Sequence, residues 1–598
     1  MPSDLRQHLP IETPEHVLLD LEIAGVGSRL LAAVIDSAIV AAIMLAGALL
    51  VVVLGSFGLV PSSALGRAWI AALAIGLGFA LGNGYFILFE GLRGGQTPGK
   101  RLVGIRVVRE TGHPVTLGAA ALRNLLRIAD FLPPPYLVGL ALIAFHPRGK
   151  RLGDLAAGTV VVRDRPSPVG RFAATAAATA LTGGPPLDDD RFRLLARFGG
   201  RAADLPPAAR ERIATTLAGR FADRPAAPGL GAAEFLLDLY AKELARRRGR
   251  LAGRAGLGER LAARQSARWD AFQTLAERAT SAGLDSFAPE ELPEFAARYR
   301  ELAADLARAR TYQADPATVA RLERLVAAGH NVLYRDDRHT WARVWVTISR
   351  EFPAAVIDSR WLVLLAWALF TAPALGGYTL LRERPALATE LLPEVMLRRA
   401  DAGRARMAEG RKYGSVEVAG RPLVASFIIT NNVRIAIACF AGGIFLGVGS
   451  LVLLAFNGLA LGTFAGHFAN QGLLSYLMEF IVGHGALELF AIWVAGAAGF
   501  LLGKSLVAPG DRSRADAMVA SGRIAVRMMG AVVVLLAIAG TIEGFLSVSG
   551  RGLAPRIGTS AGSLAFLVAY LARGAAWRRT SALSQHGPHP DRQSLDLA

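Results

Sequence analysis

The chain of 598 residues has one cysteine, Cys439, which lies within an apolar run. A single cysteine excludes an internal disulfide framework and a cysteine-based metal site within one chain. The first 28 residues are polar and mildly acidic, and they lack the basic, apolar and small-residue parts of a signal peptide. We therefore expect the first apolar helix to act as its own insertion signal.

Catalytic motifs are also missing. The charged middle of the chain has no Gly-rich phosphate loop, no Ser/His/Asp set and no pair of carboxylates with convincing spacing. We expect no catalytic residues, no cofactor and no metal, so the chain is predicted not to be an enzyme. The formal charge of +18 is compatible with nucleic-acid binding. The basic inner loops of a membrane protein explain it more simply, and we expect no nucleic-acid partner.

Apolar sequence is abundant instead. Hydrophobic residues make up 53% of the chain, and many lie in runs of about 20 residues, the length at which a helix crosses the hydrocarbon core of a bilayer. The fold class is therefore predicted to be an all-α polytopic membrane protein with a small β element, and the lipid bilayer is its first partner. The spans are predicted near residues 29–54, 68–88, 361–381, 425–450, 451–468, 475–502, 528–546 and 558–575.

Basic residues predict the orientation. The loop after residue 502 is net basic, and Arg573, Arg578 and Arg579 follow the last span. Because Lys and Arg are enriched on the cytoplasmic side, both termini are predicted in the cytoplasm, at the inner membrane of a bacterium. Residues 382–425 are then expected on the extracytoplasmic side, although they too are mildly basic.

The N-terminal third contains two segments that alternate as strands, residues 101–109 and 159–163. If they pair in a small sheet, both lie on one side of the membrane. Three prolines at 133–135 break the helical sequence between them. We therefore predict a helical hairpin of residues 117–131 and 136–145, which returns the chain to the same side.

Arg29 and Asp36 of the first span, the block GQTPGKRLVGIRVV, and Asp154 in KRLGDLAAGTVVV resemble the RDD family of bacterial membrane proteins. The resemblance covers about residues 25–165, and Arg29, Asp36 and Asp154 match the arginine and two aspartates of the family name. It implies a membrane domain for which ion or proton transport has been suggested in some members. The alternative is that Arg29 and Asp36 pair with each other or with neighbouring helices.

Further along, several segments resemble the stage II sporulation protein M family, over about residues 258–577. They are the helical run from Trp269 through ARYRELAADLARARTY and VAAGHNVLYR, then ASFIITNNVRIAIACFAGGIFLG, FNGLALG, HGALELFAIWVAGAAGFLLG and TIEGF. The resemblance implies a polytopic inner-membrane scaffold for partner proteins of the envelope. The predicted domains are 1–165 (RDD-like), 166–230 (linker and short helices), 231–355 (cytosolic helices), 356–577 (sporulation protein M-like) and 578–598 (disordered tail). The cytosolic domain, with helices predicted at 258–282, 289–312 and 316–335, is expected to serve in docking.

Polar residues stand out in the C-terminal spans, because such groups are costly in hydrocarbon unless they are paired or face water. They are Asn431, Asn432, Arg434, Asn457, His484, Glu488 and Glu543. His484 and Glu488 are four residues apart and share a helix face, so they suit a metal ligand pair or a proton relay. Alternatively they form a hydrogen-bonded pair that sets helix register and satisfies Asn457 or Arg434. Asn431 and Asn432 are predicted to cap a helix as it enters the membrane.

These features support two main functions. The leading one is a non-enzymatic membrane scaffold or transporter-associated protein, with other membrane or envelope proteins or a second copy of the chain as partners. The alternative is an ion- or proton-coupled transporter that uses Asp36, Glu90, Glu488 and Glu543. A metal-dependent hydrolase within the membrane is weaker, because the HGALE segment supplies too few ligands.

Overall fold

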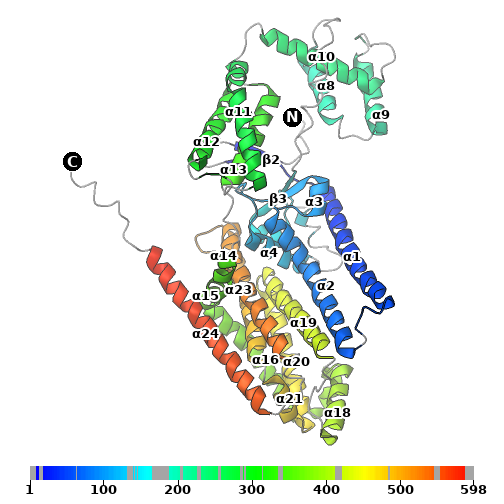
Figure 1. Cartoon of the computed structure of the whole chain (residues 1–598), viewed down its shortest axis with the longest axis vertical. Coiled ribbons are helices and arrows are strands. Elements are labelled where there is room, and N and C mark those ends of the chain that lie inside the picture. The colour runs from blue at the N-terminus through cyan, green and yellow to red at the C-terminus, as the bar shows by residue number, and fades with distance from the viewer. Residues whose placement is uncertain are drawn as a thin grey trace, which may run out of the picture.

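Helices dominate the computed structural model, which is elongated, with a bundle of long helices at one end and smaller helical units at the other (Figure 1). The structure describes residues 8–12, 18–61, 63–130, 139, 142–143, 146–163, 187–202, 207–221, 223–224, 231–252, 257–282, 287–288, 291–312, 314–333, 341–410, 420–482, 485–543 and 553–585.

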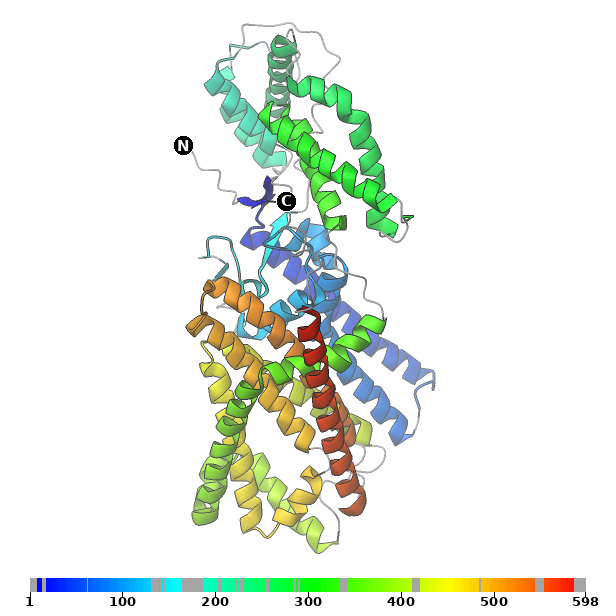
Figure 2. The same ribbon diagram turned by 90° about the vertical axis from the view of Figure 1, so that its left-hand side faces the viewer.

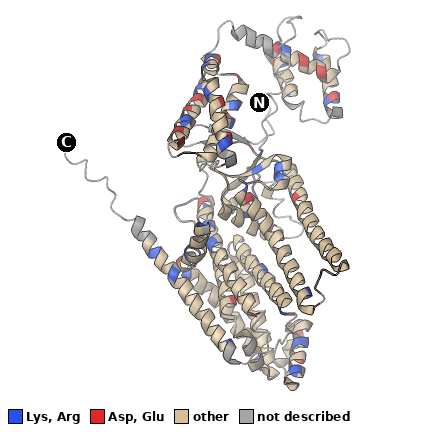
Figure 3. Ribbon diagram, viewed as in Figure 1, with Lys and Arg blue, Asp and Glu red and all other residues tan. Residues whose placement is uncertain are grey.

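Seven helices among these residues are long and apolar enough to cross a membrane. They are α1 (Val26–Ser56), α2 (Ala64–Leu92), α16 (Arg360–Glu383), α19 (Arg421–Ala441), α20 (Val448–Asn470), α22 (Gly485–Val507) and α23 (Arg514–Ile542). The predicted all-α polytopic class is confirmed. Charged residues are sparse along the bundle and dense in the smaller units (Figure 3).

An eighth long helix, α24 (Leu553–Gln585), runs along the bundle (Figure 2). It contains the predicted span 558–575, but it is not one of the seven helices apolar enough to cross a membrane. Its last turns occupy residues 578–585, where the sequence predicts a disordered tail. Tyr570 of α24 donates a 2.9 Å hydrogen bond to the carbonyl of Ile348. That carbonyl belongs to a π-helical turn, η4 (Thr347–Glu351), between α14 (Trp341–Val346) and α15 (Phe352–Asp358).

The small sheet lies at one end of the bundle, called here the sheet end (Figure 1). Strands β3 (Ile105–Arg109) and β4 (Thr159–Arg163) pair antiparallel, with Val107 opposite Val161, as predicted. A further hairpin, β1 (His8–Glu12) and β2 (Leu18–Glu22), adjoins it through a bridge between Ile23 and Val162.

The strand predicted from residue 101 begins only at Ile105, because a short helix, α3 (Pro98–Val103), precedes it. Thr97 caps this helix by accepting a hydrogen bond from the Lys100 N–H, and Pro98 suits its first turn. Gly104 ends it with a φ of 72°, a left-handed conformation that favours glycine.

Three short helices cover the sheet end: α4 (Leu117–Leu125), α5 (Arg127–Asp130) and α7 (Leu152–Ala157). Their buried side chains join the core of the large bundle, where Leu122 and Ala156 lie against Gly522 of α23. The second arm of the predicted hairpin, residues 136–145, lies largely outside the described residues.

Two smaller helical units follow the sheet in sequence. Helices α8 (Asp189–Arg201), α9 (Pro207–Ala218) and α10 (Ala232–Ala252) share one core. Helices α11 (Leu257–Ala282), α12 (Glu291–Thr311) and α13 (Pro316–Leu333) form another around Trp269, Phe272 and Phe295. The helices predicted for this second unit, called here the three-helix unit, are confirmed to within a few residues.

The opposite end of the bundle, called here the distal end, carries the short helices α17 (Ala388–Leu391), α18 (Glu394–Ala408) and α21 (Leu474–Ile481) (Figure 1). The prediction of one helix over residues 475–502 is wrong, because α21 and α22 are separate. The prediction for residues 425–450 is also wrong at its end. Helix α19 stops at Ala441, and Leu446 and Gly447 have positive φ before α20 begins.

Helices α16 and α20 pack with their backbones almost in contact. A Cβ added at Gly458 would lie 2.0 Å from the carbonyl oxygen of Phe370, and one at Gly462 would lie 1.9 Å from that of Ala374. Both distances are below any real Cβ contact, so only glycine permits this approach. In lipid, helices associate mainly through close packing of small residues. Apolar side chains gain little free energy by leaving lipid for a helix interface, because both environments are apolar.

We expect Gly462→Ala to destabilise the bundle by about 1–3 kcal/mol, because the added methyl group meets backbone that cannot move aside alone. Gly376→Ala on α16 is the matched control, since its Cβ would meet nothing within 4 Å. Thermal unfolding of the detergent-solubilised protein measures both. Equal midpoints for the two variants would contradict the packing described.

Candidate functional site

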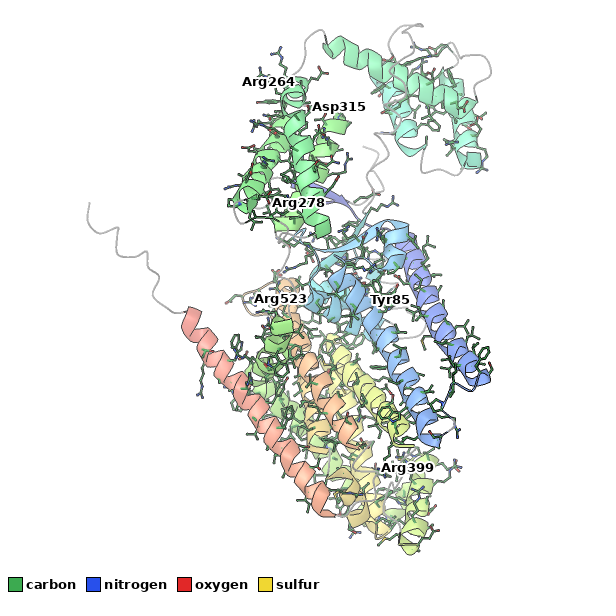
Figure 4. The ribbon with its side chains drawn as sticks, viewed as in Figure 1. Tyr85, Arg264, Arg278, Asp315, Arg399 and Arg523 are labelled. Carbon is green, nitrogen blue, oxygen red and sulfur yellow. The ribbon has the colours of Figure 1, made fainter. Side chains whose placement is uncertain are left out.

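Asp36 lies fully buried near the start of α1 and is held by uncharged donors. Its carboxylate accepts hydrogen bonds from the Tyr85 hydroxyl at 2.9 Å, the Thr97 hydroxyl at 2.5 Å and the Gly99 N–H at 2.7 Å. Figure 4 shows Tyr85 on α2 below the sheet end. Asp36 therefore fastens α1 to α2 and to the loop that begins α3.

Arg29, one turn from the start of α1, reaches across the sheet end. Its guanidinium donates hydrogen bonds to the carbonyls of Ala24 at 3.0 Å and Gly149 at 2.5 Å. It also lies 3.7 Å from Asp154 on α7. Arg29 and Asp36 do not pair with each other. Each binds neighbouring elements, which is one of the alternatives that the sequence left open. The motif residues Arg29 and Asp154 lie close together, and Asp36 has a different set of partners.

Two more carboxylates are buried beside Asp154. Glu90 at the end of α2 binds the Lys100 ammonium, accepts a 3.0 Å hydrogen bond from Asn124, and lies 3.4 Å from the Arg123 Nε. The same Nε lies 3.5 Å from Asp154. Arg123 thus bridges α2 and α7 from α4.

Asp130 completes the cluster. It accepts a 3.2 Å hydrogen bond from the Leu152 N–H, and Arg151 lies 3.7 Å from it. We call these eight residues the charge network. Its basic members are Arg29, Lys100, Arg123 and Arg151, and its acidic members are Asp36, Glu90, Asp130 and Asp154. The basic and acidic groups are equal in number. Glu90, Asp130 and Asp154 lie next to basic groups, whereas Asp36 is satisfied by hydrogen bonds. Burial requires such partners, because an unpaired ion in a low-dielectric interior is strongly disfavoured.

The electrostatics of Asp154 reflect this arrangement. Burial alone would raise the pKa of its carboxyl, but Arg123, Arg151 and Arg29 outweigh that effect and hold the pKa at about 2. Asp154 is therefore ionised at all physiological pH values. A carboxylate that cannot take up a proton in this range suits a structural ion pair better than a proton relay.

A second polar cluster crosses the C-terminal bundle. The Asn431 amide donates to the Asn432 side-chain oxygen at 3.4 Å, and the Asn432 amide donates to Glu488 at 2.6 Å. Glu543, buried at the end of α23, is near enough to Glu488 for their charges to interact, and Arg399 of α18 also acts on it. We call Asn431, Asn432, Glu488 and Glu543 the polar chain. It leads from the surface of α19 into the bundle.

Several expectations for this bundle are wrong. Asn431 and Asn432 do not cap a helix, because α19 begins ten residues earlier at Arg421. Glu488 binds Asn432, whereas Asn457 donates to the Leu453 carbonyl of its own helix at 2.7 Å. Arg434 is exposed on α19. His484 lies outside the described residues, so its predicted pairing with Glu488 stays a prediction.

The partners of Glu90, which are Arg123, Lys100 and Asn124, were not predicted from the sequence. One signal was present: Arg123 and Asp130 are charged residues in an otherwise apolar helical segment. Such groups need partners when buried. Those partners lie on other elements, which spacing alone does not reveal. Among the described residues, no group of three or more His, Cys, Asp or Glu side chains is placed to hold a metal ion.

The apolar helices and their buried ion pairs define a polytopic membrane protein. Residues 23–158 match the RDD family, and residues 363–548 match stage II sporulation protein M. One chain thus contains a region that matches each of the two families named from the motifs, called here the RDD domain and the sporulation protein M domain. The second match begins at residue 363, not near 258 as predicted. Residues 259–335, the three-helix unit, match a domain of unknown function. No curated protein and no solved structure matches the chain.

We expect Asp154→Asn to destabilise the protein by about 3–5 kcal/mol at neutral pH, because it leaves buried arginines without their carboxylate. Asp154 has a lower pKa in the folded protein, about 2, than the ordinary 3.8. Its stabilisation is therefore complete above pH ~4 and is lost as the pH falls towards ~2.

Thermal unfolding in detergent over this pH range should show the gap between wild type and Asp154→Asn closing towards low pH. The exposed Asp401, which pairs with Arg404 on the surface of α18, supplies the control. Asp401→Asn should change the stability by less than about 1 kcal/mol. A gap that persists unchanged at pH 2 would argue against the ion pairs described for Asp154.

Proposed function

We propose that this protein is a non-enzymatic scaffold of the bacterial inner membrane, with both termini in the cytoplasm. Its RDD domain joins the three-helix unit to the sporulation protein M domain, so that proteins bound on one side of the membrane are held in register with those in the bilayer. The partners would be other membrane or envelope proteins. The protein would perform no chemistry of its own.

One observation carries this proposal: the RDD domain contributes to two separate cores. Ile23, Val108 and Val160 of the sheet region pack with the three-helix unit. On the other side, Leu122 and Ala156 pack with the long helices of the bundle. A domain with a packed neighbour on both sides acts as a rigid connector, because close-packed interiors transmit displacement with little compression.

The contact with the three-helix unit is specific as well as apolar. The ring of His113, in the turn after β3, packs against that of His330 of α13, with centroids 4.7 Å apart and planes tilted by 48°. His330 is buried, and its Nδ1 lies 3.3 Å from the hydroxyl oxygen of Tyr299 on α12. The Tyr299 contact lies within the three-helix unit, where it orients the His330 ring that meets His113 of the sheet region.

The connector can be tested at Val108, which is buried where the sheet meets the three-helix unit. We expect Val108→Arg to release this unit, because a charged side chain cannot be buried there without a partner. A protease should then cut the chain beside α11 and α13 at least about tenfold faster. Arg300→Ala, on the exposed face of α12, is the control. Equal cleavage rates for both variants would refute the connector.

The alternative function, an ion- or proton-coupled transporter, is favoured by one feature, the polar chain with its two interacting carboxylates. Against it stands the balance of the charge network, in which the acidic groups already have basic or hydrogen-bonding partners. We therefore rank transport second.

Proteoliposomes that contain the whole chain should dissipate a pH or cation gradient no faster than empty vesicles, because a scaffold needs no conducting path. Fluorescent dyes for pH and for cations measure this flux. A flux that Glu488→Gln abolishes, and that Asn457→Leu leaves intact, would refute the scaffold function and support the transporter function.

A further inference from the structure

An exposed arginine lies near the middle of a membrane span. The span formed by α19 and the turn after it runs over Arg421–Ile444. Arg434 is 13 residues from its first residue and 10 from its last, or about 20 Å and about 15 Å along the helix axis. The hydrocarbon core is ~30 Å thick, so the backbone of Arg434 lies well away from both surfaces.

Nothing in the described part of the chain covers or neutralises this arginine. Arg434 is exposed, and it makes no hydrogen bond or ion pair with the described residues. Asn431 and Phe427 are exposed on the same face, at spacings of three and four residues. We call Phe427, Asn431 and Arg434 the arginine face. Helices α2, α5, α20, α22 and α23 pack against α19 and leave Arg434 exposed.

A charged side chain at this depth is strongly disfavoured in lipid and persists where it meets a partner. The arginine face offers the guanidinium of Arg434 and the amide of Asn431 as hydrogen-bond donors. Such a donor set fits a carboxylate, which arginine binds in a planar, bidentate geometry. The chemistry of the missing partner is thus an Asp or Glu side chain at mid-depth.

The described spans of a second copy offer no such carboxylate. Within the described residues of the seven spans, the carboxylates are Asp36, Glu90, Glu383, Glu488 and Asp516. Asp36 and Glu90 are buried in the charge network, and Glu488 is bonded to Asn432 inside the bundle. The exposed Glu383 lies at the last residue of α16, and Asp516 in the first turn of α23, both far from mid-depth. Two arginine faces together would place like charges in lipid.

We propose that the arginine face is the docking site for a transmembrane helix of a different protein that carries an Asp or Glu near its middle. This inference rests on the proposed scaffold function and identifies the kind of partner it holds. Because Asn431 continues through Asn432 to Glu488, the docked carboxylate would also be linked to the interior of the bundle.

The experiment uses the full-length protein, fluorescently labelled at its C-terminus, in phosphatidylcholine vesicles at pH 7.5. The probes are three synthetic Leu/Ala transmembrane peptides that differ only at the central residue, which is Glu, Gln or Lys. Energy transfer from protein to labelled peptide measures binding. We expect the Glu peptide to bind about tenfold more tightly than the Gln peptide, the strength of a good interhelical polar contact.

Substitutions of Arg434 test whether this residue causes the preference for the Glu peptide. Arg434→Leu should remove the preference for the Glu peptide, and Arg434→Glu should transfer it to the Lys peptide. Because Arg434 is exposed, neither change is expected to disturb the bundle, and the reversal in Arg434→Glu shows that the variant is folded. Arg67→Leu, an exposed arginine in the first turn of α2, is the matched control and should behave as wild type.

Equal binding of the Glu and Gln peptides by the wild type would overturn the proposal. A preference that survives Arg434→Leu would also overturn it. If phosphatidylglycerol added to the vesicles displaces the Glu peptide, and is itself retained by wild type but not by Arg434→Leu, the site binds a lipid phosphate instead and the proposal is wrong. None of these results depends on ion flux, so failure of this site and failure of the scaffold function are distinguishable.

Discussion

The burial of the charge network is the constraint on which the rest of the structure depends. Eight charged side chains from α1, α2, α3, α4, α5 and α7 meet where the membrane helices join the sheet. Removing one member of an ion pair leaves the other as a buried charge without compensation, which costs several kcal/mol. The network therefore holds these six elements in one arrangement, and the sheet they support has a fixed position on which the three-helix unit can pack.

The C-terminal bundle is held together differently. There the helices approach through glycine, as where Gly458 and Gly462 of α20 meet the backbone of α16. In lipid, close van der Waals contact replaces the hydrophobic effect as the source of cohesion between helices. The RDD domain thus relies on ion pairs and the sporulation protein M domain on close packing. The shared core around Leu122 and Ala156 joins the two.

The polar chain and the arginine face are two parts of one feature. Asn431 lies at the surface beside Arg434, and its neighbour Asn432 turns inward to Glu488. Adjacent residues on a helix point about 100° apart, so two asparagines in sequence can serve an outer and an inner partner. Residues 431–434 can therefore connect the lipid-facing surface of α19 with the carboxylates of the bundle.

The sequence by itself determined most of the apolar spans, the strand pair and the two families, because these depend on periodicity, length and local motifs. It also indicated that Arg29, Asp36 and Asp154 belong together in one domain. Only the tertiary structure decided that Arg29 meets Asp154 while Asp36 meets Thr97 and Gly99, and that Glu488 meets Asn432. Such pairings join residues far apart in the chain, and the choice of partner follows from how whole helices pack, which no local pattern encodes.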